Sequence, residues 1–525
     1  MLLSMFVSSA SPVMVQECTG TAQSKQLNSC CTTDEVDGPI CTPVYKLKHS
    51  RRKPYSIRKP PQMSAQDSTL DFPFLRDPHT LQVISQSKVF FIMRGLPGSG
   101  KSTLVRAITE AYISSIVCSA DDYFFQDGEY KFDASCLSSA HEACQNRAKA
   151  ACNECVSPVL VDNTNVRRWE MKFYLELASH RNYVVIPLQP KTPWRWNAVE
   201  LADRNKHGVD VETLKRKVTQ FDDVIPMYYA WFLNEWASKQ LSFIAQYLLG
   251  ECAQRFPAFA DRLLQQIHIS SAELRQAHQH SGDTSADADI FAAVLRDYYK
   301  SGKKAGCLVH CTAKFCGCGR AVGAKAYHAQ PKVQNSMGQA FMLEISSICF
   351  SPRTIGARVK LGEDQLSLFD KPEESDWNGR QLSTATQNGT RKDGSPGARN
   401  YSPSQGKKSK GGKKKSPKPK EDNTVFTENR SESPSKKGFE PAFTKPLAKL
   451  RGRSAHITVA CGPGFESRET NFDVLRLCDM EAAVPSSEAN CVDVTGGKAR
   501  YFDGGVCCVY FDAPLRVNTI YSGFY

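Results

Sequence analysis

The sequence predicts a parallel α/β domain followed by a second domain that combines helices with many β-strands. Apolar runs of buried-strand type recur at 89–93, 158–161 and 183–186, with helix-like spacing between them. Strands that alternate with helices favour a parallel sheet. From 306 onward short β-type segments follow one another. A chain of 525 residues is long enough for two or three domains, each with its own core.

The first domain begins with an apolar run that ends in a phosphate-binding loop. GLPGSGKS at 95–102 matches GxxxxGK[ST] between a strand-type and a helix-type segment. Backbone amides of the glycine-rich turn and the following helix N-terminus would hold phosphate oxygens. Lys101 would reach the β- and γ-phosphates, and Ser102 would hold Mg²⁺. The predicted nucleotide-binding residues are Gly95, Gly98, Ser99, Gly100, Lys101, Ser102 and Thr103.

Two acidic positions are candidates to complete this site. Asp162 ends the second strand-type run, where a metal- or water-positioning carboxylate is expected, and Asp121 or Asp122 in SADDY could accept a proton from an attacking hydroxyl. Their alternative role is that of a helix cap or turn residue. With GLPGSGKST, DDY and DNTN, the segment resembles the polynucleotide-kinase branch of P-loop phosphotransferases. The resemblance implies ATP and Mg²⁺, although Phe124 and Phe125 stand where that branch carries a basic residue.

The second domain contains two His-x-Thr motifs in β-type segments, His310-Cys-Thr312 and His456-Ile-Thr458. Period-two alternation places each His and its Thr on one strand face. Two such strands side by side would offer two imidazoles and two hydroxyls to one anion. One imidazole would take a proton from water and the other would protonate a leaving alkoxide, while the hydroxyls stabilise the phosphate oxygens. This chemistry needs no metal. A third match at 268–270 lies in a helical pattern that separates its two side chains.

The order of these motifs resembles the 2′,3′-cyclic-nucleotide 3′-phosphodiesterase family of the two-histidine phosphoesterases. The similar stretches are YYAWFL at 228–233, LVHCTAKFC at 308–316, TIGARV at 354–359 and SAHIT at 454–458. The resemblance implies an α+β bilobal domain that hydrolyses 2′,3′-cyclic phosphates of nucleotides or RNA ends to 2′-phosphates. It implies His310 as proton acceptor and His456 as proton donor, although the residues alone leave these two roles open. Thr312 and Thr458 become phosphate ligands.

Phe315 is a weaker candidate, as a contact for the substrate base. It lies three residues beyond Thr312, so regular alternation would place it on the opposite face, in the core. The resemblance also implies association with myelin membranes through a prenylated C-terminal Cys box, and such a box is absent after Ile520. We therefore expect a cytoplasmic protein, peripheral to membranes. No run of 18 apolar residues predicts a transmembrane helix.

The positive charge of the chain is concentrated in one segment. The net charge is +13, but 391–420 alone carries eleven Lys and Arg against one Asp, so the remainder is nearly electroneutral. With 41% hydrophobic residues the chain as a whole is neither disordered nor fibrous. The basic run favours a third hypothesis, a scaffold that binds RNA, acidic lipid or cytoskeletal partners.

These observations predict a division into domains. We expect a disordered basic extension over 1–84, a P-loop kinase-like domain over 85–215 and a phosphodiesterase domain over 216–525. A Lys-rich disordered insertion at 370–445 would interrupt the last domain. Apolar spacing between about 210 and 300 predicts a largely helical stretch.

Overall fold

The computed structural model describes residues 68–127, 129–267, 294–295, 297–299, 308–370, 452–484, 491–502 and 504–525. All of them belong to one compact unit. Apart from Asp370, the predicted Lys-rich insertion lies outside the described residues, as do the first 67 residues and the His-x-Ser match at 268–270.

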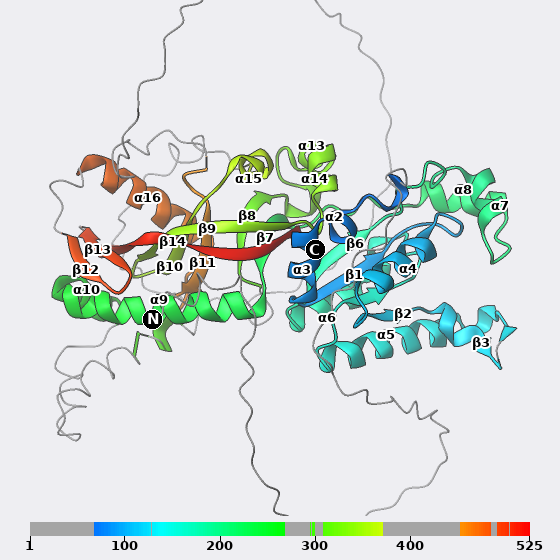
Figure 1. Ribbon diagram of the computed structural model, residues 1–525, viewed down its shortest axis with the longest axis horizontal. Coiled ribbons are helices and arrows are strands. Elements are labelled where there is room, and N and C mark those ends of the chain that lie inside the picture. The colour runs from blue at the N-terminus through cyan, green and yellow to red at the C-terminus, as the bar shows by residue number, and fades with distance from the viewer. Residues whose placement is uncertain are drawn as a thin grey trace, which may run out of the picture. The chain divides into compact units, whose positions relative to one another are not determined.

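The α/β part is built on a four-stranded parallel sheet with the order β2-β5-β1-β6 (Figure 1). Its strands are β1 (Val89–Met93), β2 (Ile116–Cys118), β5 (Val159–Val161) and β6 (Val184–Leu188). Every residue of β1 is buried, as expected where a parallel sheet is covered on both faces. The remaining elements are helices α4 (Lys101–Ala111), α5 (Leu137–Asn153), α6 (Lys172–His180), α7 (Ala198–Arg204) and α8 (Val211–Thr219), and the hairpin β3 (Phe125–Gln126) and β4 (Glu129–Tyr130). The predicted domain boundary at 215 falls inside α8.

Ordered structure begins earlier than the sequence predicted. Helices α2 (Pro73–Arg76) and α3 (Pro78–Ser85) lie in the segment assigned to a disordered extension, so that assignment is wrong for 68–84. Each helix has a proline in its first turn, where the missing N–H costs nothing. Asp77 caps α3 by accepting from the Thr80 N–H at 3.0 Å. Phe74 and Ile84 are fully buried in a cluster that includes β1, so packing stabilises these helices.

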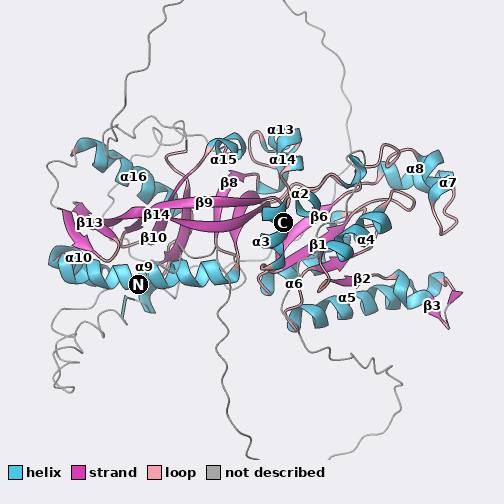
Figure 2. Cartoon of the chain, viewed as in Figure 1, coloured by secondary structure: helices cyan, strands magenta, loops and turns pink. Residues whose placement is uncertain are grey.

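The second part contains an eight-stranded antiparallel sheet with the order β12-β13-β14-β7-β8-β11-β10-β9. Strand β14 also pairs with β9, so the circuit β14-β7-β8-β11-β10-β9 closes on itself. Figure 2 shows its helices and strands. The strands are β7 (Tyr228–Leu233), β8 (His310–Phe315), β9 (Ala340–Phe350), β10 (Thr354–Lys360), β11 (His456–Cys461), β12 (Cys491–Val494), β13 (Gly497–Phe502) and β14 (Val506–Phe524). The helices are α9 (Glu235–Arg255), α10 (Pro257–Ile267), α13 (Ala324–His328), α14 (Pro331–Asn335), α15 (Glu363–Leu368) and α16 (Glu469–Ala483).

Strand β7 corrects the prediction of a largely helical stretch after 210. All six of its residues pair with β14 on one side, and five of them pair with β8 on the other. A short apolar run cannot be assigned to helix or strand by periodicity alone, and its aromatic residues favour a strand. The helical pattern begins one residue later, where Asn234 caps α9 by accepting from the Ala237 N–H at 2.8 Å.

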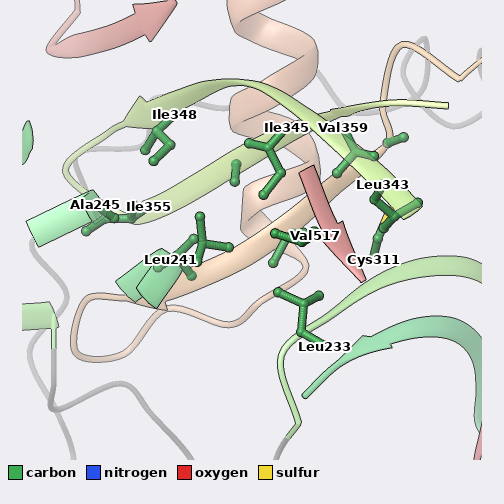
Figure 3. Close-up of a cluster of buried hydrophobic side chains, with 14 of the residues drawn as sticks. Leu233, Leu241, Ala245, Cys311, Leu343, Ile345, Ile348, Ile355, Val359 and Val517 are labelled. Atoms are coloured by element: carbon green, nitrogen blue, oxygen red, sulfur yellow. The ribbon is translucent and has the colours of Figure 1, made fainter. Parts of the chain in front are cut away.

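An apolar core fills one side of this sheet. Leu241 and Ala245 of α9 belong to one buried cluster with Cys311 of β8, Ile345 of β9 and Ile457 of β11. Figure 3 shows part of this cluster, including Leu343, Ile348 and Val517. Because Cys311 and Ile457 point into the core, the residues on either side of them in β8 and β11 face the other way.

Candidate functional site

The phosphate-binding loop lies between β1 and α4, as the sequence predicted. Gly98 and Gly100 have φ values of 78° and 98°, which only glycine adopts without strain. The Gly95 N–H donates to the Thr164 carbonyl at 2.9 Å, which fixes the start of the loop. Ser99 is 1% exposed, and its hydroxyl is buried without a hydrogen-bond partner. Ser102 and Thr103 are exposed in the first turn of α4.

Lys101 and Asp162 face each other at this loop. Asp162 follows β5 directly, and its N–H donates to the Cys118 carbonyl at 2.9 Å. Burial raises the pKa of the Asp162 carboxyl, and the charge of Lys101 opposes that shift. Burial likewise lowers the pKa of Lys101 against the charges of Asp162 and Asp121. The Oδ1 atom of Asp162 is a second buried oxygen without a partner.

These groups fit the phosphates of a nucleotide with Mg²⁺. The inward-turned loop and Lys101 suit phosphate oxygens, and the Asp162 carboxylate, whose Oδ1 lacks a partner, suits Mg²⁺ together with the Ser102 hydroxyl. Of the two candidate bases, Asp122 forms an ion pair with Arg147 at 2.9 Å. Asp121 is exposed and lies 3.8 Å from His207. Of the two, Asp121 is the carboxylate whose charge acts on Lys101, and its contact with a basic partner is the longer one.

The two His-x-Thr motifs lie on adjacent antiparallel strands, β8 and β11. The ladder between them pairs Ile457 with Cys311. In that register His456 lies opposite Thr312 and Thr458 opposite His310. All four side chains stand on the face opposite the apolar core, because Cys311 and Ile457 are both fully buried in it. The strands therefore bring the four predicted residues together with a local twofold relation.

The imidazoles of the two motifs are anchored in the same way. His310 Nδ1 lies 2.7 Å from the Leu308 carbonyl, and His456 Nδ1 lies 2.7 Å from the Ser454 carbonyl. A carbonyl only accepts, so each neutral ring carries its proton on Nδ1. Proton exchange with a ligand would then take place at the Nε2 atoms.

The surroundings of the two histidines differ. The His310 ring stacks on Tyr228 with centroids 4.6 Å apart, and Tyr228 stacks on Phe524 at 5.1 Å. His456 is only 7% exposed. Thr458 donates its hydroxyl to Thr470 of α16 at 3.0 Å. The site thus has an aromatic side at β7 and a polar side under α16.

Phe315 departs from regular alternation. A register shift in the β7–β8 ladder leaves Tyr229 opposite Lys314 and Ala230 opposite Thr312, so one residue of β8 bulges between them. Ala313 and Lys314 are both buried, and Phe315 is 57% exposed. The alternative in which Phe315 packs in the core is therefore wrong, and its ring is exposed on the surface, while its contact with a substrate base stays a prediction.

Sequence reasoning missed two neighbours of the histidines. Tyr228 was assigned to a helical stretch, although its aromatic run carried a strand signal. Arg358 pairs directly with His456 across β10 and β11. The sequence did contain a signal for Arg358, since it is the single charged residue in the apolar run TIGARV. A charge in a buried strand requires a partner.

Two negative findings concern the described residues only. No described helix combines the length and apolar character that a membrane crossing requires. Within the same residues, no three His, Cys, Asp or Glu side chains gather as a set of metal ligands.

Comparisons with known proteins match two segments of the chain to family models and find several relatives. Residues 90–224 match the model of an AAA domain, and 225–393 match that of "2′,3′-cyclic nucleotide 3′-phosphodiesterase (CNP or CNPase)". The 2′,3′-cyclic-nucleotide 3′-phosphodiesterase of Rattus norvegicus is 34% identical over 64% of this chain and 76% of its own length. That of Pongo abelii is 28% identical over 87% of both chains. A chain of the Pnkp1/Rnl/Hen1 RNA repair complex is 19% identical over 26% of this chain and 44% of its own, with a TM-score of 0.22.

Proposed function

This chain belongs to the 2′,3′-cyclic-nucleotide 3′-phosphodiesterase family, and from that premise we propose that His310 and His456 hydrolyse 2′,3′-cyclic phosphates to 2′-phosphates by acid–base catalysis. The substrates are nucleoside 2′,3′-cyclic phosphates or RNA ends that carry this group. The observation that supports the proposal most is the Ile457–Cys311 register, which groups two imidazoles and two hydroxyls on one sheet face.

The reaction requires one base and one acid. Water attacks phosphorus as one histidine accepts its proton at Nε2, and the bond from phosphorus to the 3′ oxygen breaks as the other histidine protonates that oxygen. By resemblance to the family, we give the first role to His310 and the second to His456. Both roles require opposite protonation states at the start, so the rate should pass through a maximum with pH.

The two threonines would bind the non-bridging phosphate oxygens. Thr312 and Thr458 are half-buried and stand beside the histidines on the same face, where hydroxyl donors stabilise charge that develops in the transition state. Replacing either one by valine removes the donor at nearly constant volume. We expect a fall in kcat of about a hundredfold to a thousandfold, the range measured for single donors of this kind.

Variants of the histidines test the proposal with EDTA present throughout. The assay follows 2′,3′-cyclic NMP and separates the 2′- and 3′-phosphate products. We expect the 2′-phosphate alone from the parent protein and a loss of at least about a hundredfold in His310→Gln and His456→Gln. His141→Gln changes an exposed histidine of α5 and serves as the control. Full activity in either motif variant would remove the basis of the proposal.

The P-loop part supports a second candidate function, 5′-hydroxyl kinase activity that would make the enzyme a bifunctional RNA end-healing protein. The specific observation is the pair of unpartnered buried oxygens, Ser99 Oγ and Asp162 Oδ1, beside Lys101. Bound ATP with Mg²⁺ would supply the transferable phosphoryl group. Lys101 would bind the phosphates, and Asp121 would orient the acceptor hydroxyl.

Phosphate transfer from radiolabelled ATP to a 5′-hydroxyl oligoribonucleotide tests this second function. We expect Lys101→Ala to abolish transfer and to leave hydrolysis of cyclic nucleotides unchanged. If the parent protein binds ATP without transferring phosphate, the P-loop part acts as a nucleotide-binding domain only.

A role as a scaffold and a place at membranes stay predictions, because the basic segment 391–420 lies outside the described residues. Deletion of that segment should remove salt-sensitive binding to RNA, acidic vesicles or cytoskeletal filaments without changing turnover. Unchanged binding after deletion would exclude the segment as the contact.

A further inference from the structure

A row of polar side chains crosses four strands of the second sheet and ends at His456. Arg358 of β10 pairs with His456 of β11 on one side and with Ser347 of β9 on the other, and Ser347 pairs with Tyr510 of β14. Directly paired residues stand on the same face of a sheet. The row therefore lies on the site face, under helix α16.

Glu481 of α16 completes this row from above. Its Oε1 accepts from Arg358 Nη1 at 2.6 Å and from the Tyr510 hydroxyl. The side chains of Arg358 and Glu481 are only 10% and 13% exposed. Burial opposes the charge on Arg358 most strongly, but Glu481, together with Cys478, Cys508 and Tyr510, raises the pKa of the guanidinium. The residue that pairs with His456 across the two strands thus carries a buried cation, which a carboxylate from the helix holds in place.

The cluster of Arg358, Glu481 and Tyr510 is not arranged to contribute much to the stability of the fold. Glu481 lies in the last turn of α16, where the helix dipole disfavours a carboxylate, and its Oε2 is buried without a partner. Buried ion pairs in general contribute little net stability, because desolvation offsets their attraction. A cluster with these costs beside a site residue suggests a role at that site.

We propose that Arg358 is a positioning residue, which together with Glu481 and Tyr510 holds His456 in place and sets the readiness of its imidazole to take up a proton. This inference rests on the proposed function, in which His456 exchanges a proton with the substrate. The Arg358 cation is the nearest neighbour of His456 in the ladder, so it disfavours imidazolium, and Glu481 limits this effect by neutralising the cation. The balance between the charges of Arg358 and Glu481 would give His456 a different proton affinity from His310, whose ring stacks on Tyr228 instead.

Other groups around β11 have different attachments. On α16, Asp473 binds Arg353, Ser351 and Thr354, and Cys478 contacts Arg358 and the Arg453 carbonyl. On β8, the titratable neighbour is His310 itself. Helix α9 meets β11 through the apolar cluster that contains Ile457. In the described structure around β11, Arg358 is therefore the charge paired directly with His456.

The proposal predicts that two single substitutions shift the pKa of His456 in opposite directions. Arg358→Gln removes the cation and leaves the Glu481 carboxylate, so the pKa of His456 should rise. Glu481→Gln leaves the cation without its counter-ion, so this pKa should fall. A full charge on a neighbouring strand in a partly buried site shifts a pKa by on the order of one unit. The double variant Arg358→Gln/Glu481→Gln and the conservative variant Arg358→Lys should both lie close to the parent protein.

The experiment is an NMR titration of labelled histidine in the full chain, with the His456 signal assigned by its loss in His456→Gln. The limbs of the pH profile of kcat/KM are measured in parallel. Arg353→Gln is the matched control, because Arg353 also joins the sheet to α16 carboxylates, Glu469 and Asp473, but does not pair with His456. We expect no shift of the His456 pKa in this control.

The possible outcomes separate this inference from the proposed function. Shifts of opposite sign in the two single variants support the role of Arg358. Shifts of equal sign, shifts below about 0.2 unit, or an equal shift in Arg353→Gln would overturn it. If His456→Gln keeps full activity, the proposed function fails, and the titration still reports independently on the charge beside His456.

Discussion

Replacing Asp473 by alanine should destabilise the second domain by about 4 kcal/mol, because this carboxylate joins α16 to the turn between β9 and β10. Its Oδ2 accepts from Ser351 Oγ at 2.6 Å and Thr354 Oγ1 at 2.7 Å, and its Oδ1 binds Arg353. Asp473, Ser351 and Thr354 are each at most 2% exposed. Hydrogen bonds to a charged group contribute about 1.5–3 kcal/mol each, and breaking a buried pair costs about 3–5 kcal/mol.

Thermal unfolding followed by near-ultraviolet circular dichroism measures this effect. A loss of 4 kcal/mol corresponds to a fall in Tm of about 10 °C for a domain of this size. Asp493→Ala is the control, because Asp493 is 86% exposed and its pair with Lys498 should contribute less than about 1 kcal/mol. A Tm for Asp473→Ala within about 2 °C of this control would refute the reasoning. Activity should fall as well, because α16 carries Thr470, the partner of Thr458.

Three further predictions concern separate parts of the molecule. Lys239 and Lys88 lower the pKa of Glu235 to about 2, so Glu235→Gln should reduce the free energy of unfolding by about 0.5 kcal/mol at pH 7. In urea titrations this difference from the parent protein should vanish as the pH falls from about 4.3 to about 2, and a difference that stays constant would contradict the prediction. Gly98→Ala should abolish binding of a fluorescent ATP analogue, because a Cβ there would meet the Leu201 carbonyl oxygen at 2.5 Å; unchanged binding would contradict this. Phe315→Ala should raise KM several-fold while Tm stays within about 1 °C, since the ring is 57% exposed; a large fall in Tm would return Phe315 to a packing role.

The sequence was most informative where chemistry requires a fixed local pattern. The loop at 95–102 could be placed between a strand and a helix because its glycines and Lys101 are needed in that order. The His-x-Thr motifs could be placed on strands because alternation puts each pair on one face. The ladder that joins them depends on strands far apart in the chain, so it became visible only in the Ile457–Cys311 register.

Three features could not be obtained from local patterns. Helices α2 and α3 are stabilised by packing of Phe74 and Ile84 against β1, and such contacts leave little periodicity in a short segment. Strand β7 is a short apolar run, for which spacing does not distinguish helix from strand. The bulge that exposes Phe315 depends on pairing with β7, and a single-residue shift reverses the face of every later side chain.

The most direct test of the central claim is product analysis of 2′,3′-cyclic NMP in EDTA, with the parent protein, His310→Gln and His456→Gln compared at equal concentration. We predict the 2′-phosphate as the only product of the parent protein and a loss of at least about a hundredfold in both variants, with Tm values unchanged within about 2 °C. Formation of the 3′-phosphate, dependence on added metal, or full turnover in either variant would contradict the assignment of the reaction to the paired motifs of β8 and β11.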